Sequence, residues 1–156
     1  MTFTISDIVR KKLETIEEMA SVQEAAKKMK DKNVSSLIVV GPDGKSQGLV
    51  TERDLVTKLC ISNIPTNTMA SREIMSSLVT INSSSSPSAA AQTMLKNNIR
   101  HLLVVDEVDA NKPIGIITPL DFTRYQEYTV DEDKEAIEDV LENYMSSADT
   151  DAFTGV

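Results

Sequence analysis

The sequence is poor in aromatic residues and in the residues that bind transition metals. Among its 156 residues there is no Trp, one cysteine (Cys60) and one histidine (His101). One cysteine excludes an intramolecular disulfide, and one Cys with one His cannot build the usual zinc site, so we expect no metal centre. Because aromatic residues are only 4%, we predict a core of Ile, Leu, Val, Met and Ala, with Cys60 packed as a small apolar residue on a helix.

The charge balance and the absence of long apolar runs restrict the partners. The formal net charge is -8, which disfavours binding to nucleic acid or to an anionic membrane. No apolar run approaches the length of a membrane span, and the polar start, Met1 to Glu14, differs from a signal peptide. We therefore expect a cytoplasmic protein without membrane insertion. A small anion can still bind where basic groups and backbone N–H groups converge.

The chain matches itself at a nearly constant shift, which indicates an internal duplication. A shift of 65 positions aligns the first part of each copy, and two additional residues within 106–113 lengthen the shift to 67 for the remainder. The aligned pairs include Ala25-Ala26 with Ala90-Ala91, Met29 with Met94, Val39-Val40 with Val104-Val105, Gly48 with Gly115, Thr51 with Thr118 and Asp54 with Asp121. The additional residues fall among turn-forming residues, as a loop insertion should.

Both copies predict the same order of elements, β-α-β-β-α. Ser21 and Glu24 form a capping box at the start of one helix, and Ser86 before Pro87 starts its counterpart. Apolar runs predict the strands, a turn at residues 42–44 separates two of them, and further apolar residues predict a second helix in each copy. The expected strands are residues 15–16, 34–40 and 48–51, then 80–81, 99–105 and 115–118; the second helices contain Leu55, Val56 and Leu59, and Phe122 and Tyr125.

These elements divide the chain into two repeats and an acidic end. We assign residues 1–61 to repeat 1, 62–70 to a linker, 71–128 to repeat 2, and 129–156 to an acidic helix and tail. Neither copy is large enough to bury both faces of its small sheet alone. The expected fold class is therefore α/β (α+β), with the two repeats packed by pseudo-twofold symmetry and clefts where they meet.

From about Ser6 to Tyr128 the sequence resembles the CBS-domain family, the paired modules named after cystathionine β-synthase. The resemblance rests on two strings of Gly, two apolar residues, Thr, two variable residues and Asp, at residues 48–54 and 115–121. An apolar strand and a capped helix precede each string. The resemblance implies a non-catalytic regulatory module that binds an adenine nucleotide (AMP, ADP or ATP, with or without Mg²⁺) or S-adenosylmethionine between the repeats. It would report ligand occupancy to an effector protein.

Carried over by position, the resemblance implies that Asp54 and Asp121 accept hydrogen bonds from ribose hydroxyls, and that Thr51 and Thr118 contact ribose or phosphate. A carboxylate is a double acceptor that suits a vicinal diol. Thr-x-x-Asp is also an ordinary helix start, with Thr as the N-cap and Asp in the first turn. The two roles are compatible, because a cap can share its acceptors with a ligand.

Other contacts implied by the resemblance are less symmetric. The base would lie between segments around Ile16 and Ile81, and Arg100 with His101 resembles a pair that reaches phosphates in nucleotide-sensing members. Alternatively, Arg100 is a solvated surface residue and His101 a strand residue satisfied by the backbone. Arg53 lies at a helix start, where it reaches phosphate or solvent. The expected ligand contacts are Ile16, Ser36, Thr51, Arg53, Asp54, Ile81, Arg100, His101, Thr118 and Asp121.

The acidic end leaves two alternatives. Residues 130–145 predict one helix whose apolar stripe packs on the same module or on a second copy in a homodimer. Otherwise the helix docks on another protein. The apolar stripe consists of Ile137, Val140, Leu141, Tyr144 and Met145.

The rival function is a structural or dimerisation module with degenerate, ligand-free sites. An enzyme is disfavoured because the sequence has no Gly-rich phosphate loop, no Cys–His pair and no second histidine.

Overall fold

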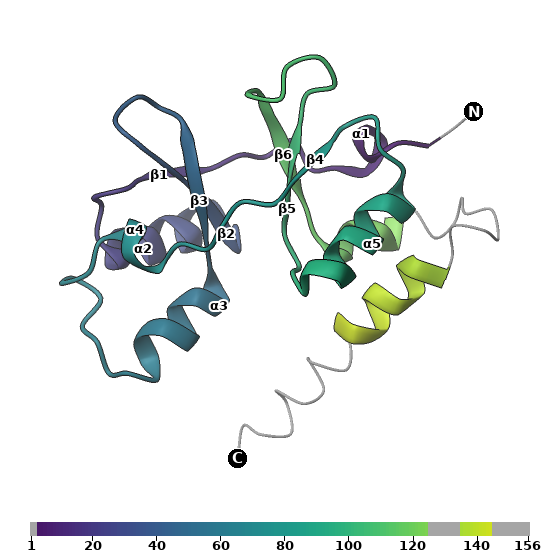
Figure 1. The fold of residues 1–156 in the computed structure, drawn as a ribbon. Coiled ribbons are helices and arrows are strands. Elements are labelled where there is room, and N and C mark those ends of the chain that lie inside the picture. The colour runs from purple at the N-terminus through teal and green to yellow at the C-terminus, as the bar shows by residue number, and fades with distance from the viewer. Residues whose placement is uncertain (1–2, 125–134, 145–156) are drawn as a thin grey trace. The chain divides into compact units, whose positions relative to one another are not determined.

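A computed structural model describes residues 3–124 and 135–144, which form two compact units (Figure 1). One unit is Leu13–Leu78, and the other combines the described parts of Met1–Lys12 and Val79–Val156. The units differ from the boundaries expected from the sequence in two segments. Residues 3–12 lie with the second repeat, and residues 71–78 lie with the first.

The unit Leu13–Leu78 has a three-stranded sheet in the order β1-β2-β3. β1 and β2 are parallel because α2 connects them, whereas β2 and β3 form an antiparallel hairpin. Its elements are β1 (Thr15–Glu17), α2 (Val22–Lys32), β2 (Ser36–Val40), β3 (Ser46–Thr51), α3 (Glu52–Leu55), the π-helix η1 (Val56–Cys60) and α4 (Ser71–Ile74).

The second unit has the same arrangement, with sheet order β4-β5-β6 and the same parallel and antiparallel pairs. Residues 135–144 add a helix, coloured yellow-green in Figure 1. The other elements are α1 (Ile5–Ile8), β4 (Thr80–Asn82), α5 (Pro87–Asn97), β5 (Leu102–Val105), β6 (Pro113–Ile117) and the 3-10 helix η2 (Pro119–Arg124).

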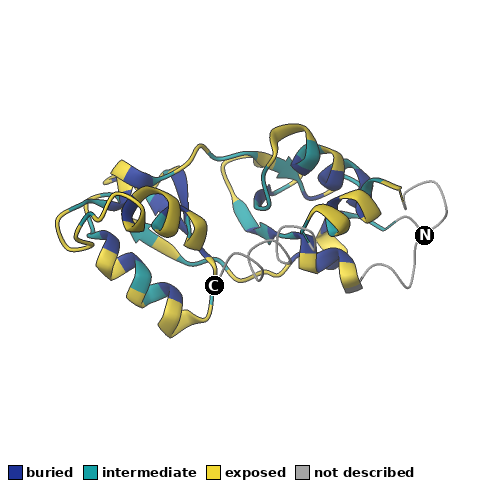
Figure 2. Ribbon diagram, turned by 90° about the horizontal axis from the view of Figure 1, so that it is seen from below, coloured by how far each residue is buried: buried dark blue, intermediate teal, exposed yellow. Residues whose placement is uncertain are grey.

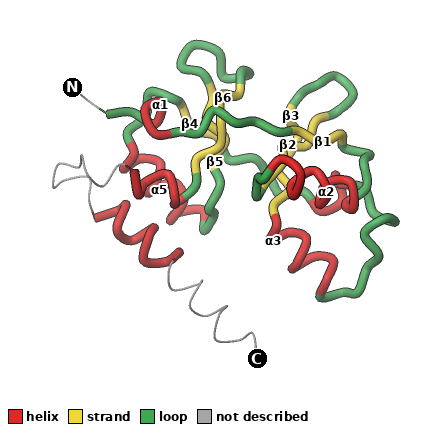
Figure 3. The backbone as a smooth tube through the Cα atoms, turned by 180° about the vertical axis from the view of Figure 1, so that it is seen from behind, coloured by secondary structure: helices red, strands yellow, loops and turns green. Residues whose placement is uncertain are grey.

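The duplication extends to individual backbone features. Ser21 and Ser86 each cap a helix by accepting a hydrogen bond from the third residue after them, as predicted. Those helices end at Asn33 and Asn98, both left-handed with φ of 53° and 51°. Each hairpin has a register shift at the equivalent place, between residues 39 and 40 and between residues 104 and 105. The predicted mixed α/β fold class is confirmed (Figure 3).

Each unit has its own apolar core, and its helices carry buried and exposed residues on opposite sides (Figure 2). The first core is aliphatic, as expected; it consists of Val22, Ala25, Met29, Leu37, Val39, Val50, Leu59 and Ile74. The second core contains a fully buried aromatic ring, Phe122, which is 0% exposed. The prediction of a purely aliphatic core is therefore wrong in this unit.

The N-terminal segment completes the second core. Ile5, Ile8 and Val9 are buried with Phe122 and Ile117. The backbone N–H of Ile5 donates to the carbonyl of Ser85 at 2.9 Å. Residue 10 then pairs antiparallel with Ile116 of β6. In the first unit, α4 and Ser76 occupy the equivalent positions beside β3, through the bridge between Ser76 and Leu49.

The acidic C-terminal helix packs on its own unit where it is described. Ile137 and Val140 are 1% and 4% exposed and belong to the second core, with Ala136 and Leu141 packed against it. The alternative of packing on the same module is therefore confirmed for residues 135–144. Predictions about Tyr125, residues 129–134 and residues 145–156 lie outside the described residues.

Two further observations concern Cys60 and membrane spans. Cys60 is exposed, so the prediction that it packs inside is wrong. Leu59, its neighbour, takes the inward position on η1 at 1% exposed, and the adjacent residue on a helix points to a different side. Among the described residues, none of the helices combines the length and the apolar character that a membrane span requires.

Candidate ligand-binding site

The first candidate site lies where β3 ends and α3 begins. Thr51 caps α3, and its hydroxyl oxygen accepts a hydrogen bond from the backbone N–H of Asp54 at 3.2 Å. Oδ2 of Asp54 accepts from the backbone N–H of Thr51 at 2.9 Å and from its hydroxyl at 3.0 Å. This reciprocal capping buries the carboxylate, which leaves Asp54 only 6% exposed.

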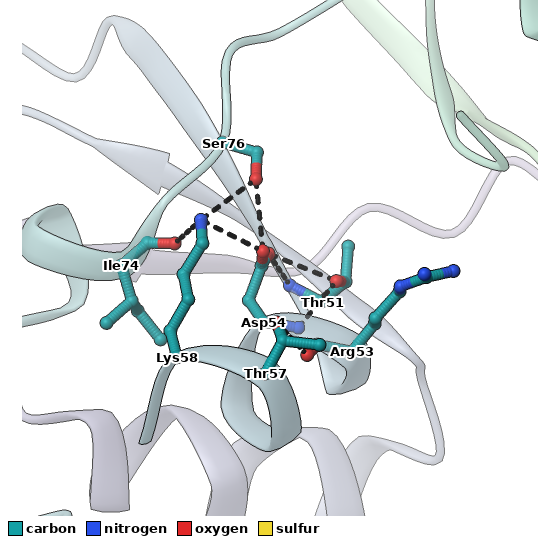
Figure 4. A network of polar contacts seen from close by, with 7 residues as sticks. All are labelled: Thr51, Arg53, Asp54, Thr57, Lys58, Ile74 and Ser76. Carbon is teal, nitrogen blue, oxygen red and sulfur yellow. Dashed lines mark hydrogen bonds and ion pairs between the residues drawn. The ribbon is translucent and has the colours of Figure 1, made fainter. Parts of the chain in front are cut away.

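The other carboxylate oxygen of Asp54 has two different partners, shown in Figure 4. The Ser76 hydroxyl donates to Oδ1 at 3.0 Å, and Nζ of Lys58 lies 3.1 Å from the same oxygen. Nζ of Lys58 also donates to the carbonyl of Ile74 at 2.8 Å and to Oγ of Ser76 at 3.2 Å. The network therefore neutralises the buried carboxylate and joins α3 and η1 to the segment after α4.

The second candidate site, after β6, repeats part of this geometry, but the backbone N–H of Asp121 donates to the carbonyl of Thr118 at 3.0 Å. The backbone N–H of Thr118 donates to Oδ2 of Asp121 at 2.8 Å, and its hydroxyl lies 3.4 Å from that oxygen. Asp121 is 1% exposed. Its Oδ1 lies 3.5 Å from Nε of Arg10, which belongs to the N-terminal segment. Arg10 thus occupies the position that Ser76 has in the first unit.

Strand pairing brings Ser36 beside Thr51, because these two residues are register partners in β2 and β3. His101, the counterpart of Ser36, directly precedes Leu102, whose register partner is Ile117 next to Thr118. The expected residues Ser36, Thr51 and Asp54 therefore lie together in one unit. His101, Thr118 and Asp121 lie in corresponding positions in the other.

The remaining expected residues lie farther from the carboxylates. Arg53 is exposed on α3, and Figure 4 shows its side chain extending away from Asp54. Ile16 in β1 pairs with Val39 of β2, and Ile81 in β4 pairs with Val104 of β5. One strand therefore separates Ile16 from β3, and one separates Ile81 from β6. Both Ile side chains are of intermediate exposure.

Arg100 contacts the C-terminal helix. Its guanidinium carbon lies 5.5 Å from the centre of the Tyr144 ring, a cation–π distance. The sequence predicts a phosphate contact or a solvated surface position for this side chain. The observed contact with Tyr144 is neither of these, and the local sequence does not indicate it because the two residues are far apart in the chain.

The site carboxylates have three partners that the sequence analysis did not predict: Lys58, Ser76 and Arg10. Lys58 had a local signal, since it follows Asp54 by four positions on the same helical segment. Ser76 and Arg10 had none, because each reaches its Asp from outside the Thr-x-x-Asp string. Among the residues the structure describes, no three His, Cys, Asp or Glu side chains gather as a metal site would require.

Comparison with known proteins identifies the two repeats. The CBS domain family model matches residues 5–60 and 71–128, which include both Thr-x-x-Asp strings. The chain belongs to the CBS-domain family. It is a tandem CBS protein, and its solved structural neighbours are CBS-domain proteins.

Relatives of this CBS pair include proteins of greater length. Protein MK0525 of Methanopyrus kandleri is 29% identical over 81% of this chain, and the matched region spans only 64% of that protein.

The CBS domain pair of protein MJ0100, solved with 5-methylthioadenosine and S-adenosyl-L-methionine, is 30% identical with a TM-score of 0.69, covering 81% of this chain and 98% of that one. A hexameric CBS-CP12 protein from bloom-forming cyanobacteria is 27% identical with a TM-score of 0.75, covering 96% of this chain and 82% of that one.

Proposed function

We propose that this tandem CBS protein is a regulatory module that binds an adenosine-containing ligand at its Thr-x-x-Asp junctions. The ligand is an adenine nucleotide or S-adenosylmethionine, and occupancy is read by an effector protein or by a second copy in a homodimer. The observation that carries this proposal is the buried carboxylate at a strand-to-helix junction, which occurs twice and each time accepts from the backbone N–H and the hydroxyl of the preceding Thr.

The chemistry of these carboxylates suits a ribose. Each ionised carboxylate has two oxygens with about four acceptor positions in total. The cap engages Oδ2 of Asp54, and Ser76 with Lys58 engages Oδ1. Two donors on each oxygen fill the acceptor positions of Asp54. A ribose hydroxyl would therefore bind by replacing Ser76 as the donor, at little net cost because one hydrogen bond is exchanged for another.

Likeness to the MJ0100 pair supports the ligand class. That pair was solved with two adenosine derivatives, 5-methylthioadenosine and S-adenosyl-L-methionine. Both carry a purine, a ribose and a substituent in place of the 5′-hydroxyl. Each Thr-x-x-Asp junction suits the ribose that all adenosine ligands share, while other residues would distinguish the substituent.

One observation favours the rival function, a ligand-free structural module. Within the described residues, no buried side-chain nitrogen or oxygen lacks a hydrogen-bond partner. Asp54 and Asp121 are therefore already satisfied by protein groups, as a purely structural cap would be.

A thermal-shift panel separates the two functions. The protein is heated with adenosine, AMP, ADP, ATP, GMP or S-adenosylmethionine, each with and without Mg²⁺. A ligand at 100 times its dissociation constant stabilises the folded state by about 2.7 kcal/mol, which raises the melting temperature by roughly 5–10 °C in a chain of this size. We expect such a shift with at least one adenine compound and little with GMP. If no compound raised the melting temperature, the ligand-free structural module would be the function instead.

Matched variants assign the shift to the carboxylates. Asp54→Asn and Asp121→Asn should reduce the ligand-induced shift, and by unequal amounts because the partners of the two carboxylates differ. Ser21→Ala is the control, since it removes a helix cap at a place with no proposed ligand role and costs about 1 kcal/mol. It should lower the melting temperature of the free protein and leave the ligand-induced shift unchanged. If Ser21→Ala also reduced the ligand-induced rise in melting temperature, the loss of a helix cap would be enough to explain the results with Asp54→Asn and Asp121→Asn.

A further inference from the structure

The two candidate sites differ at one structurally equivalent position. In each unit a short helix precedes a residue that pairs with the strand leading to Thr-x-x-Asp: Ser76 pairs with Leu49, and Arg10 pairs with Ile116. The side chain of that residue contacts Oδ1 of the buried Asp in both units. The first repeat thus has a short neutral hydroxyl beside its carboxylate, and the second has a long cation.

Buried neighbours fix the position of Arg10. Ile8 and Val9 are 7% and 8% exposed in the second core. A Cβ added to Gly115 in β6 would lie 2.3 Å from the carbonyl oxygen of Arg10, so only glycine allows this close approach of the two backbones. The backbone of Arg10 is therefore held against β6, while its side chain remains 68% exposed.

The hydrogen-bond donors of the two cations are used differently. An ammonium has three donors, and Nζ of Lys58 has three acceptors around it: Oδ1 of Asp54, the carbonyl of Ile74 and Oγ of Ser76. Lys58 is therefore saturated by the protein. The guanidinium of Arg10 has five donors, and its contact with Asp121 is made through Nε. Its two terminal amino groups, on a largely exposed side chain, are accessible to a ligand.

A guanidinium with accessible terminal amino groups is suited to an anion with several oxygens. Arginine binds phosphate through two parallel hydrogen bonds, whereas a saturated lysine offers none. We infer that Arg10 is a ligand contact of the second repeat, which binds the phosphate of a nucleotide whose ribose is held by Asp121. The first repeat, with Ser76 and a saturated Lys58, takes an adenosine ligand that has no phosphate. This inference rests on the proposed function.

Arg10 could instead act only on Asp121, by neutralising the buried carboxylate and holding its orientation. That role would affect every ligand whose ribose contacts Asp121, with or without a phosphate. The phosphate role affects only phosphorylated ligands. A comparison of adenosine with AMP therefore distinguishes a ligand contact from a positioning residue.

The test is isothermal titration calorimetry of the full chain with adenosine and with AMP, in a background of Asp54→Asn. That substitution removes the proposed ribose contact of the first repeat, so both compounds report on the second. Arg10→Ser copies the residue that the first repeat already has at this position. We expect it to weaken AMP binding by roughly tenfold or more, the usual effect of losing a charge-assisted hydrogen bond, and to leave adenosine binding within about twofold. Arg10→Lys, which keeps the charge without the planar fork, should lie between the two. The control is Arg72→Ser, an exposed arginine on α4 of the other unit, which should change neither affinity.

The reciprocal variant Ser76→Arg, made with Asp54 intact, should increase the affinity of the first repeat for AMP. Thermal unfolding of each variant checks that it remains folded. Equal weakening of AMP and adenosine by Arg10→Ser would assign Arg10 a positioning role and overturn the inference. Unchanged AMP binding would overturn it as well. If the unmodified protein binds neither compound, the proposed function itself fails, a result that differs from both of the others.

Discussion

Asp54 is a buried carboxylate whose two oxygens face different partners. Oδ2 belongs to the helix cap, and Oδ1 faces Ser76 and Lys58. Removing the cation leaves the charge of Asp54 in a site where its side chain is only 9% exposed. A buried charge that loses its partner is destabilising, although solvent screens this pair because the Lys58 side chain is 42% exposed.

We therefore predict that Lys58→Met lowers the free energy of unfolding by about 1 kcal/mol. The measurement is urea denaturation at neutral pH. Lys27→Met is the control, because Lys27 is exposed on α2 of the same unit. Equal effects of the two substitutions would show that Lys58 contributes no more than a surface charge.

Single residues also show the limit of sequence reasoning. Ser36, Thr51 and Asp54 could be placed together from the sequence because they lie at the ends of adjacent strands in one repeat. Arg10 could not be placed beside Asp121, since the pairing of residue 10 with Ile116 joins opposite ends of the chain and has no local signature. The outward position of Cys60 was missed because Leu59 takes the buried position on that helix.

At the scale of elements, the long helices of the two repeats end in the same way. Asn33 and Asn98 are left-handed C-cap residues, and the N–H of each donates to carbonyls of the last helical turn. Asn tolerates this conformation better than residues with an apolar side chain. The sequence pattern predicted the N-terminal caps of these helices from Ser21 and Ser86, since a Ser cap is a local signal.

We predict that Asn33→Ala and Asn98→Ala each cost about 1 kcal/mol of unfolding free energy, because alanine is strained in the left-handed region. Asn33→Gly and Asn98→Gly should retain or increase stability. Chemical denaturation measures both series. Gln23→Ala, on the exposed face of α2, is the control for a helical alanine and should change stability little. Alanine variants as stable as the unmodified protein would contradict the assigned caps.

The C-terminal helix is a structural part of the second unit over residues 135–144. Ile137 is 1% exposed in a core that also contains Phe122 and Met94. We predict that Ile137→Ala destabilises the protein by about 2–4 kcal/mol through loss of burial and the cavity left behind. Asp139→Ala, exposed on the same helix, should have little effect. Thermal unfolding compares them, and a stable Ile137→Ala variant would show that this helix contributes little to the core.

At the scale of the whole molecule, the two compact units do not coincide with the two sequence repeats. Residues 3–12 lie with the second repeat, and residues 71–78 lie with the first. Ile8 precedes the first repeat's sheet in the chain but is buried in the second core, whereas Ile74 is buried in the first core. The sequence predicted the duplication and the element order because these follow from local patterns. The difference between units and repeats depends on long-range packing, which a repeat alignment does not contain.

We predict that Ile8→Ala and Ile74→Ala act on opposite units. Hydrogen exchange should show that Ile8→Ala lowers the protection of amides in β5 and β6, and that Ile74→Ala lowers it in β2 and β3. The two positions are equivalent, so each substitution is the control for the other. Loss of protection in β2 and β3 after Ile8→Ala would contradict the division into units.

We propose that the two Thr-x-x-Asp junctions of this CBS pair bind an adenosine ligand. The most direct measurement is an NMR titration of the ¹⁵N-labelled full chain with S-adenosylmethionine and, separately, with AMP. We predict that the largest saturable shifts occur at the amides of Thr51, Asp54, Thr118 and Asp121, whose N–H groups or side chains form the junctions. Binding at the junctions would be contradicted if neither compound produced saturable shifts at any of these four amides.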